Sequence, residues 1–120
     1  MTLGYDENQP TRDEVDALPG EVALEFGANW CSICAGAKPD LDAALGAHPE
    51  VQRIKVADGK GLPLGRSFGV KLWPTLILLR DGEEVGRVVR PQDRAEVESA
   101  LAEAGFGERG PSGRAGADDG

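Results

Sequence analysis

The residues best suited to chemistry are two cysteines, Cys31 and Cys34, which are the only cysteines in the chain. They follow an alternating apolar segment, residues 22–26, that predicts a strand, and they precede apolar residues at helical spacing. A CxxC at such a junction places the first sulfur on the first helical turn, where unpaired N–H groups and the helix dipole favour negative charge. Because the thiolate is the reactive form and the second sulfur is near enough to close a disulfide, the pair indicates a redox centre.

The bulk composition narrows the class of protein around this pair. The chain has 120 residues, 40% of them hydrophobic, and a net charge of -8, which argues against nucleic acids and anionic membranes as partners. No apolar run approaches the length of a membrane span, and residues 1–7 lack the basic and apolar regions of a secretory signal. We therefore expect a cytoplasmic protein, in which a CxxC is catalytic or metal-binding rather than a structural disulfide.

Patterning predicts one α/β domain over residues 1–104, with residues 1–9 loose and a disordered Gly-rich tail over 105–120 whose one hydrophobic anchor is Phe106. The strands are expected to form a mixed sheet of about four strands, the first ones parallel and the last pair antiparallel, with helices on both faces. The first predicted element is a short helix with Thr11 as its cap and Glu14 three residues later, which ends before Pro19. Strands are predicted at 22–26, 51–57, 75–79 and 84–89, and helices at 31–47, 62–68 and from 92 or 93 to 104.

Two segments and one proline make the chain resemble a thioredoxin over roughly Glu21 to Ala104. They are Glu25-Phe26-Gly27-Ala28-Asn29-Trp30-Cys31-Ser32-Ile33-Cys34, Gly69-Val70-Lys71-Leu72-Trp73-Pro74-Thr75-Leu76, and Pro39 five residues after the second cysteine. The resemblance implies that Cys31 is the exposed attacking cysteine and Cys34 the buried resolving one. It also implies that the Trp73–Pro74 bond is cis, that Pro74 packs against the disulfide, and that the backbone of Trp73 pairs with an extended substrate.

The chain departs from the thioredoxin pattern in five places. Ser32-Ile33 stands where the family usually has Gly-Pro, and Ala35 where it has Lys. Glu25 replaces a buried Asp, Arg90 replaces a Gly, and the first strand of the fold is not evident before the initial helix. These changes bear on redox potential and choice of partner rather than on the class of chemistry.

Glu25 has two interpretations. Its alternation with Val22, Leu24 and Phe26 is compatible with a solvated carboxylate on an edge strand. In a sheet covered on both faces it would instead be buried near the resolving thiol, where it could accept that thiol's proton. The position that the resemblance gives to an acid favours this second role. Lys55, on the neighbouring strand, either pairs with Glu25 or points to solvent.

The expected substrate-binding surface surrounds the two sulfurs. Trp30 and Trp73 are among the few aromatic residues and flank the motif cysteine and the proline. They are either plain core aromatics or, as we favour, a partly exposed apolar rim that suits a peptide or protein, with Ile33 and Pro74 as further substrate-binding residues. Arg90 either lines the same groove or is an ordinary surface charge.

The sequence thus predicts a thiol–disulfide oxidoreductase that reduces protein or peptide disulfides by dithiol exchange through Cys31 and Cys34. We expect a monomer with no cofactor beyond this cysteine pair and with an upstream reductase to recharge it. One alternative is a thioredoxin-like binding or chaperone module that holds a partner in the Trp73–Pro74 groove with little turnover. A weaker alternative is a zinc module, for which His48 is the only further soft ligand.

Overall fold

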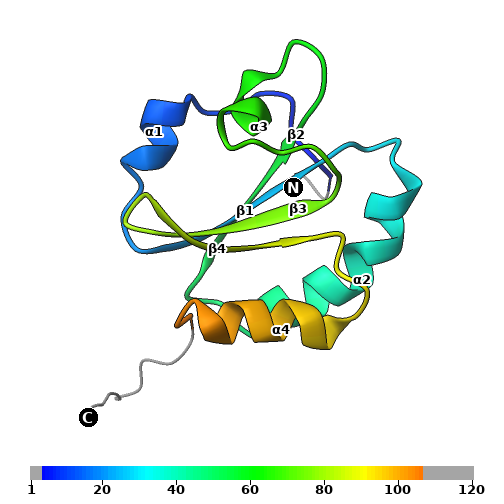
Figure 1. Cartoon of the computed structure of the whole chain (residues 1–120), viewed down its shortest axis with the longest axis vertical. Helices are drawn as coiled ribbons and strands as arrows, with labels where there is room; N and C mark the ends of the chain where they lie inside the picture. Colours follow the sequence, from blue (N-terminus) through cyan, green and yellow to red (C-terminus); the bar gives the residue numbers. More distant parts are fainter. Residues whose placement is uncertain (1–3, 107–120) are drawn as a thin grey trace.

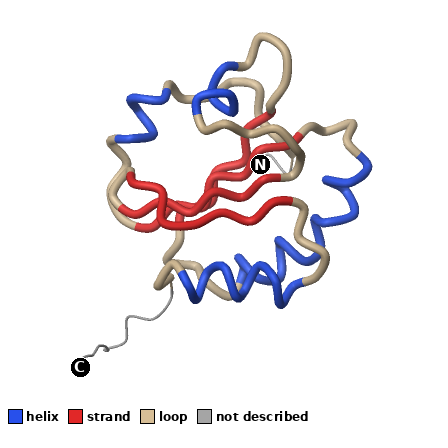
Figure 2. Tube along the Cα trace, viewed as in Figure 1, coloured by secondary structure: helices blue, strands red, loops and turns tan. Residues whose placement is uncertain are grey.

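A computed structural model describes residues 4–106, which form one four-stranded sheet with helices on both faces (Figures 1 and 2). The elements in chain order are α1 (Arg12–Asp16), β1 (Glu21–Gly27), α2 (Ser32–Gly46), β2 (Gln52–Ala57), α3 (Pro63–Ser67), β3 (Thr75–Arg80), β4 (Glu83–Val89) and α4 (Arg94–Glu103). The predicted α/β class and order of elements are confirmed. None of the described helices is long and apolar enough to span a bilayer.

The strand order brings the two motifs to one edge of the sheet. The order is β2-β1-β3-β4, with β1 parallel to β2 and antiparallel to β3, and with β3 antiparallel to β4. At the end of β1, Phe26 pairs with Thr75 at the beginning of β3. The CxxC that follows β1 and the proline that precedes β3 therefore lie at the same end of two adjacent central strands.

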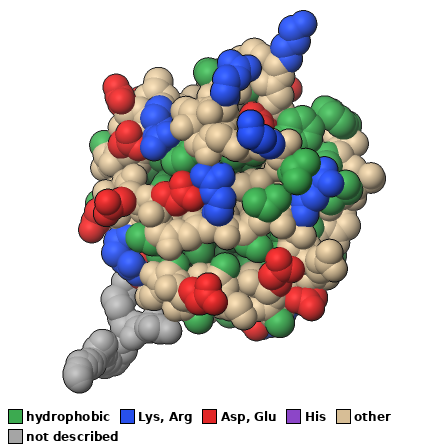
Figure 3. All heavy atoms as spheres, viewed as in Figure 1, with side chains coloured by type: hydrophobic (Ala, Val, Ile, Leu, Met, Phe, Trp, Pro, Cys, Tyr) green, Lys and Arg blue, Asp and Glu red, His purple; other side chains and the backbone are tan. Residues whose placement is uncertain are grey.

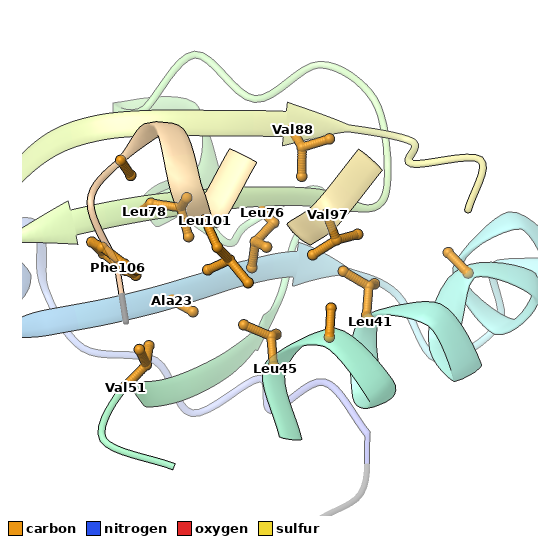
Figure 4. Packing of buried hydrophobic residues seen from close by; sticks show 13 residues of the cluster. Ala23, Leu41, Leu45, Val51, Leu76, Leu78, Val88, Val97, Leu101 and Phe106 are labelled. Carbon is orange, nitrogen blue, oxygen red and sulfur yellow. The ribbon is translucent and has the colours of Figure 1, made fainter. Parts of the chain in front are cut away.

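Two hydrophobic cores hold the layers together, one on each face of the sheet. α2 and α4 cover one face and α1 and α3 the other (Figure 1). The α2/α4 core contains Ala23, Ala37, Leu41, Ala44, Leu45, Val51, Leu76, Leu78, Val88, Val97, Leu101, Ala104 and Phe106 (Figure 4). The opposite core contains Val15, Val22, Leu24, Phe26, Val56, Leu64, Phe68, Ile77 and Leu79. The alternation along β1 places Glu25 on the α2 side, on the same face as Ala23.

The N-terminal segment corrects one prediction. Tyr5 is buried, and the backbone of Asp6 pairs with β2 through Asp6 N–H to Lys55 O (3.1 Å) and Ala57 N–H to Asp6 O (2.9 Å). The expectation of a loose segment over residues 1–9 is therefore wrong at residues 5 and 6, because a single aromatic side chain supplies enough apolar surface to dock the segment. Within residues 4–11, the strand that the resemblance places before α1 is represented by one bridge, between Asp6 and Val56.

The C-terminal boundary of the domain lies two residues beyond the predicted one. Phe106 is only 1% exposed within the α2/α4 core, and its N–H donates to Leu101 O at 2.9 Å. The domain therefore extends to Phe106, and the predicted tail cannot begin at Gly105. The rest of that tail, residues 107–120, lies outside the described residues.

Candidate active site

Cys31 caps the N-terminus of α2. Its backbone is extended (φ -86°, ψ 114°), and its Sγ accepts the Cys34 backbone N–H at 3.2 Å. The first turn of α2 contains no acidic side chain, so nothing there opposes the positive end of the helix dipole. Cys31 is also partly exposed. A negative charge on this accessible sulfur is thus stabilised by a backbone donor and by the helix itself, which is the arrangement that activates a thiol.

Cys34 lies in the opposite environment. Its side chain is 3% exposed and packs with Tyr5 and Ala57. Burial, followed by its hydrogen bond with Cys31, raises the pKa of the Cys34 thiol to about 11. Cys34 therefore keeps its proton at neutral pH and needs an acceptor for that proton when it acts as a nucleophile.

Glu25 is buried, with 1% of its surface exposed, and is linked to Cys34 through Tyr5, which packs with that cysteine. The Tyr5 hydroxyl donates to Glu25 Oε2 at 2.5 Å. Arg53 donates to Oε1 through Nη2 at 2.7 Å and through Nε at 3.2 Å. The interpretation of Glu25 as a solvated edge carboxylate is thus wrong, because β1 is a central strand that is covered on both faces.

The cation that pairs with Glu25 is Arg53, which sequence reasoning did not consider. In the β1–β2 register Lys55 lies opposite Glu25 and Arg53 opposite Ala23, so both belong to the same face of β2. Arg53 reaches diagonally to Glu25 and also donates to Asp42 Oδ1 on α2 at 2.7 Å. Lys55 Nζ lies 4.8 Å from the centroid of the Tyr5 ring. Alternation along the strand could not distinguish these two cations.

The proline loop forms the other wall of the site. The Trp73–Pro74 bond is cis, and Pro74 is buried at the beginning of β3. Arg90 at the end of β4 contacts this loop twice, donating its backbone N–H to Pro74 O and its Nε to Trp73 O, both at 2.9 Å. Arg90 also has a φ of 49°, a left-handed conformation that glycine adopts more easily. The structure therefore places Arg90 beside the cis-proline.

An apolar surface surrounds Cys31. Trp30 is 79% exposed, and Ile33 and Leu72 are each nearly half exposed. The Trp30 and Trp73 rings meet edge to face at 5.4 Å, and Trp73 Nε1 donates to Asp58 Oδ2 at 2.8 Å. In Figure 3 hydrophobic side chains gather at the upper right, over the β1–α2 loop, with basic side chains beside them. The rim predicted from Trp30, Ile33 and Trp73 is thus assembled, and Asp58 fixes one of its tryptophans.

Three residues of the site escaped sequence reasoning: Tyr5, Arg53 and Asp58. Tyr5 is the only tyrosine of the chain and stands in an otherwise polar segment, which is a signal that could have been used. Asp58 lies in a Gly-rich stretch that indicates only a turn, and Arg53 lies in a strand whose pairing was unknown. Their roles depend on contacts that no local pattern encodes.

The zinc alternative receives no support from the arrangement of side chains. Within residues 4–106, no three or more His, Cys, Asp or Glu residues come together as a metal site would need. His48 Nδ1 lies 3.4 Å from Glu50 Oε2 at the far end of α2.

Comparison with known proteins decides the family. The family model described as Thioredoxin matches residues 7–103. The chain belongs to the thioredoxin family. It is similar to a thioredoxin of Chlamydia muridarum, 37% identical over 75 residues that cover 62% of this chain and 74% of the relative. Thioredoxin H2-1 of Oryza sativa subsp. japonica is 34% identical over 80 residues, which cover 67% of this chain and 57% of the rice protein.

A solved structure extends this similarity to nearly the whole thioredoxin domain. Thioredoxin 2 from Pseudomonas aeruginosa PAO1, in its reduced form, is 48% identical with a TM-score of 0.78, covering 88% of this chain and 98% of that one. With its CxxC at the beginning of α2, the chain is a thiol–disulfide oxidoreductase of the class that reduces protein disulfides. Thioredoxins act on protein disulfides and are themselves recharged by reductases.

Proposed function

We propose that Cys31 is the nucleophile and Cys34 the resolving thiol of a protein-disulfide reductase. Cys31 thiolate attacks one sulfur of a substrate disulfide, and the other substrate sulfur leaves as a thiolate that takes up a proton from solvent. Cys34 then loses its proton toward Glu25 and attacks Cys31 Sγ. The bond between Cys31 and the substrate breaks, the substrate leaves reduced, and Cys31 and Cys34 are left as a disulfide.

The observation that carries this proposal is the difference between the two sulfurs. Cys31 is accessible and accepts a backbone N–H at the positive end of a helix. Cys34 is 3% exposed, and its pKa is raised to about 11 by burial. Only the first sulfur is both accessible to a substrate and bonded to a backbone N–H at a helix N-terminus, so the order of attack follows from the positions of the two sulfurs.

The rim around Cys31 supports a peptide or protein as substrate. Trp30, Ile33 and Leu72 expose apolar surface that a folded or extended polypeptide can cover, and Trp73 is held at its edge by Asp58. Trp73 O lies in the loop before β3 and accepts a bond from the Arg90 side chain, so an extended segment can pair with this carbonyl once that side chain moves. The proposed substrate-binding residues are thus Trp30, Ile33, Trp73 and Pro74, and Arg90 lines the same groove by occupying the Trp73 carbonyl.

The proposal includes the cellular setting. We place this reductase in the cytoplasm, acting as a monomer, with the Cys31–Cys34 pair as its only redox group and a separate reductase as its electron source. Its net charge of -8 supports protein partners over nucleic acids and anionic membranes. Fractionation of the source cells and sedimentation of the purified protein test the first two points.

Two serine variants test the roles of the cysteines. Cys31→Ser should abolish reduction of a disulfide-containing protein. Cys34→Ser should leave the first attack intact and accumulate a mixed disulfide that mass spectrometry detects on Cys31. Reduction that persists in Cys31→Ser, or a mixed disulfide that forms on Cys34 in the wild-type chain, would overturn the assignment.

The reduction potential of the pair tests the direction of electron flow. A value near about -270 mV supports a cytoplasmic reductant, whereas a value above about -200 mV indicates an oxidase or isomerase. The exposed apolar rim could also hold a partner without redox chemistry, as the binding or chaperone alternative requires. Partner capture that survives replacement of both cysteines by serine, together with negligible turnover, would favour it over the reductase.

A further inference from the structure

Tyr5 contacts both Glu25 and Cys34, the two groups between which the function proposed above moves a proton. Its hydroxyl donates to Glu25 Oε2 at 2.5 Å, entirely within the protein interior. Its ring packs with Cys34 and Ala57 in one buried cluster. After burial and the Glu25 carboxylate, the adjacent Cys34 also contributes to the raised pKa of Tyr5, which agrees with the packing of the phenol against the thiol.

Gly27 shows how closely the tyrosine and the thiol approach each other. A Cβ added at Gly27 would lie 2.5 Å from Tyr5 Cζ, the ring carbon that bears the hydroxyl, and 2.9 Å from Cys34 Sγ. Tyr5 Cζ and Cys34 Sγ thus both pack against the Cα of Gly27, and a side chain at this position would push them away from β1. The absence of a side chain at Gly27 lets the phenol and the thiol lie side by side.

The N-terminal segment holds the ring in this position. Asn29 and Tyr5 form a reciprocal pair, in which Tyr5 N–H donates to Asn29 Oδ1 at 2.8 Å and Asn29 Nδ2 donates to Tyr5 O at 3.0 Å. The backbone of Asp6 is tied to β2 on the other side. A buried side chain fixed from both directions is preorganised, which is what proton transfer over a short path requires.

We propose that Tyr5 relays the proton of Cys34 to Glu25 during resolution of the mixed disulfide, a step that rests on the function proposed above. The Cys34 S–H proton moves to the Tyr5 oxygen while the Tyr5 O–H proton moves to Glu25 Oε2. The resulting Cys34 thiolate attacks Cys31 Sγ, and the electron pair of the broken bond leaves on the substrate sulfur. Tyr5 ends neutral, Glu25 ends protonated, and no external reagent is consumed until Glu25 returns its proton to solvent.

The surroundings favour this route over direct transfer to the carboxylate. Glu25 Oε1 is occupied by Arg53, and Oε2 by the Tyr5 hydroxyl. Burial, followed by the adjacent carboxylate, raises the pKa of Tyr5, so the phenol does not ionise alone and both protons move together. The other charged or titratable groups around this path are Arg53 and Lys55 on β2, Cys31 at the beginning of α2, and Lys38 and Asp42 along α2.

The rival route is through water in a pocket beside the sulfurs, which Tyr5, Cys31, Cys34, Lys38 and Lys55 line. The two routes differ in what Tyr5→Phe does. The substitution keeps the ring and removes only the hydroxyl, so a water route would resolve the mixed disulfide at an unchanged rate.

The test measures resolution alone. Cys31 is first linked to a fluorescent peptide thiol in a Cys34-blocked form, the block is removed, and release of the peptide is followed between pH 6 and 11. Tyr5→Phe should lower the pH-independent rate of peptide release, the plateau of the pH profile near neutral pH, about a hundredfold, and Glu25→Gln should do the same. The double variant should be no slower than either single one, because both groups act on one proton path. The rates should converge near pH 11, where Cys34 ionises unaided.

Matched controls separate the relay from other causes. Gln9→Ala removes a tie of the N-terminal segment to Ala57 and Leu64 without touching the hydroxyl, and should resolve at the wild-type rate. An unchanged plateau in Tyr5→Phe, or a profile that only moves along the pH axis, would overturn the relay and leave Tyr5 a positioning residue. So would rate effects that multiply in the double variant.

Two further readouts keep the proposal falsifiable. If two protons move in the transition state, the resolution rate of the wild-type chain should depend on the deuterium fraction of the solvent along a curve. A straight line would contradict the relay, even if Tyr5→Phe fails to fold. The rate of the first attack by Cys31 should be the same in wild type and Tyr5→Phe. A wild-type chain that neither attacks nor resolves would refute the proposed function itself, whereas normal resolution in Tyr5→Phe refutes only the relay.

Discussion

The two cysteines sit three residues apart and face two different regions of the molecule. The outer region comprises Cys31 and the rim formed by exposed Trp30, Ile33 and Leu72 and half-buried Trp73, and it is built on loops and on a helix N-terminus. The inner region comprises Cys34, Tyr5, Glu25 and Arg53, and it is built on two strands, a helix and the N-terminal segment. The outer region activates its thiol with backbone groups, and the inner one controls its thiol with side chains.

This difference has consequences for substitution. Backbone N–H groups and the helix dipole persist whatever side chains surround Cys31, so the outer region should tolerate changes with effects mainly on substrate affinity. The inner region depends on a buried charge that is paired on both oxygens, so removing any partner leaves a desolvated group behind. We expect changes in the inner region to cost stability and changes in the outer region to cost binding.

The largest effect should follow from Arg53→Met. It removes the cation that donates to Glu25 Oε1 and leaves the carboxyl buried without that partner. The free energy of unfolding at pH 7 should fall by about 4 kcal/mol, measured by urea denaturation of the reduced protein. The matched control is Arg94→Met, which breaks an ion pair with Glu98 on the surface of α4 and should cost less than about 1 kcal/mol. Equal losses in the two variants would contradict the contrast between the regions.

The next effect is a pH dependence that belongs to Cys34. The pKa of its thiol is raised from an ordinary 9.0 to about 11 in the folded state, chiefly by burial. The unfolded chain therefore releases this proton at lower pH than the folded chain. The stability that the Cys34 thiol contributes to the folded state is complete below pH 9 and is lost as pH rises toward 11. The loss should reach about 3 kcal/mol.

Denaturation of the reduced protein at pH 8 and pH 11 measures this effect, with Cys34→Ala as the reference. Groups that do not interact with Cys34 titrate in the same way in both proteins, so their contributions cancel in the difference. A wild-type chain that loses no more stability than Cys34→Ala would show that the thiol is not held neutral by its surroundings.

The outer region should respond through affinity. Trp73→Ala removes an aromatic ring that packs on Trp30 and is held by Asp58. The KM for a protein disulfide should rise about tenfold, while the rate with a small-molecule disulfide should change little because Cys31 is untouched. Val85→Ala is the control, since it removes an exposed apolar side chain on β4 without a place in the rim. A loss of rate with both substrates would mean that Trp73 positions the cysteines instead.

The same contrast explains what could be predicted from the sequence. The outer region follows from contiguous motifs: the Trp30 to Cys34 segment and the Trp73-Pro74 pair each carry their own geometry, and the strand order brings them together. The elements were recognisable because the alternation in β1, the continuous apolar run of β3 and the capping box of Thr11 and Glu14 are local signals.

The inner region was only half predictable because its members are distant in sequence. Glu25 was identifiable from its position six residues before Cys31, but its partners come from residues 5 and 53. A lone tyrosine in a polar segment gave too little pattern to predict docking, and alternation could not choose between Arg53 and Lys55. Phe106 escaped the predicted domain for the same reason, as one buried ring after a glycine.

The smallest effect, and the one that most sharpens the contrast, should come from Arg90→Gly. Glycine relieves a φ of 49° but removes the bond from Arg90 Nε to Trp73 O, so the free energy of unfolding should change by less than about 1 kcal/mol. Trp73 O becomes available to an extended substrate, and the KM for an uncharged disulfide peptide should fall about threefold. Arg90→Ala should show the same KM but lower stability, because it loses the bond without relieving the backbone. A rise in KM in both variants would reverse this interpretation, since Arg90 would then bind the substrate directly rather than compete with it for the Trp73 carbonyl.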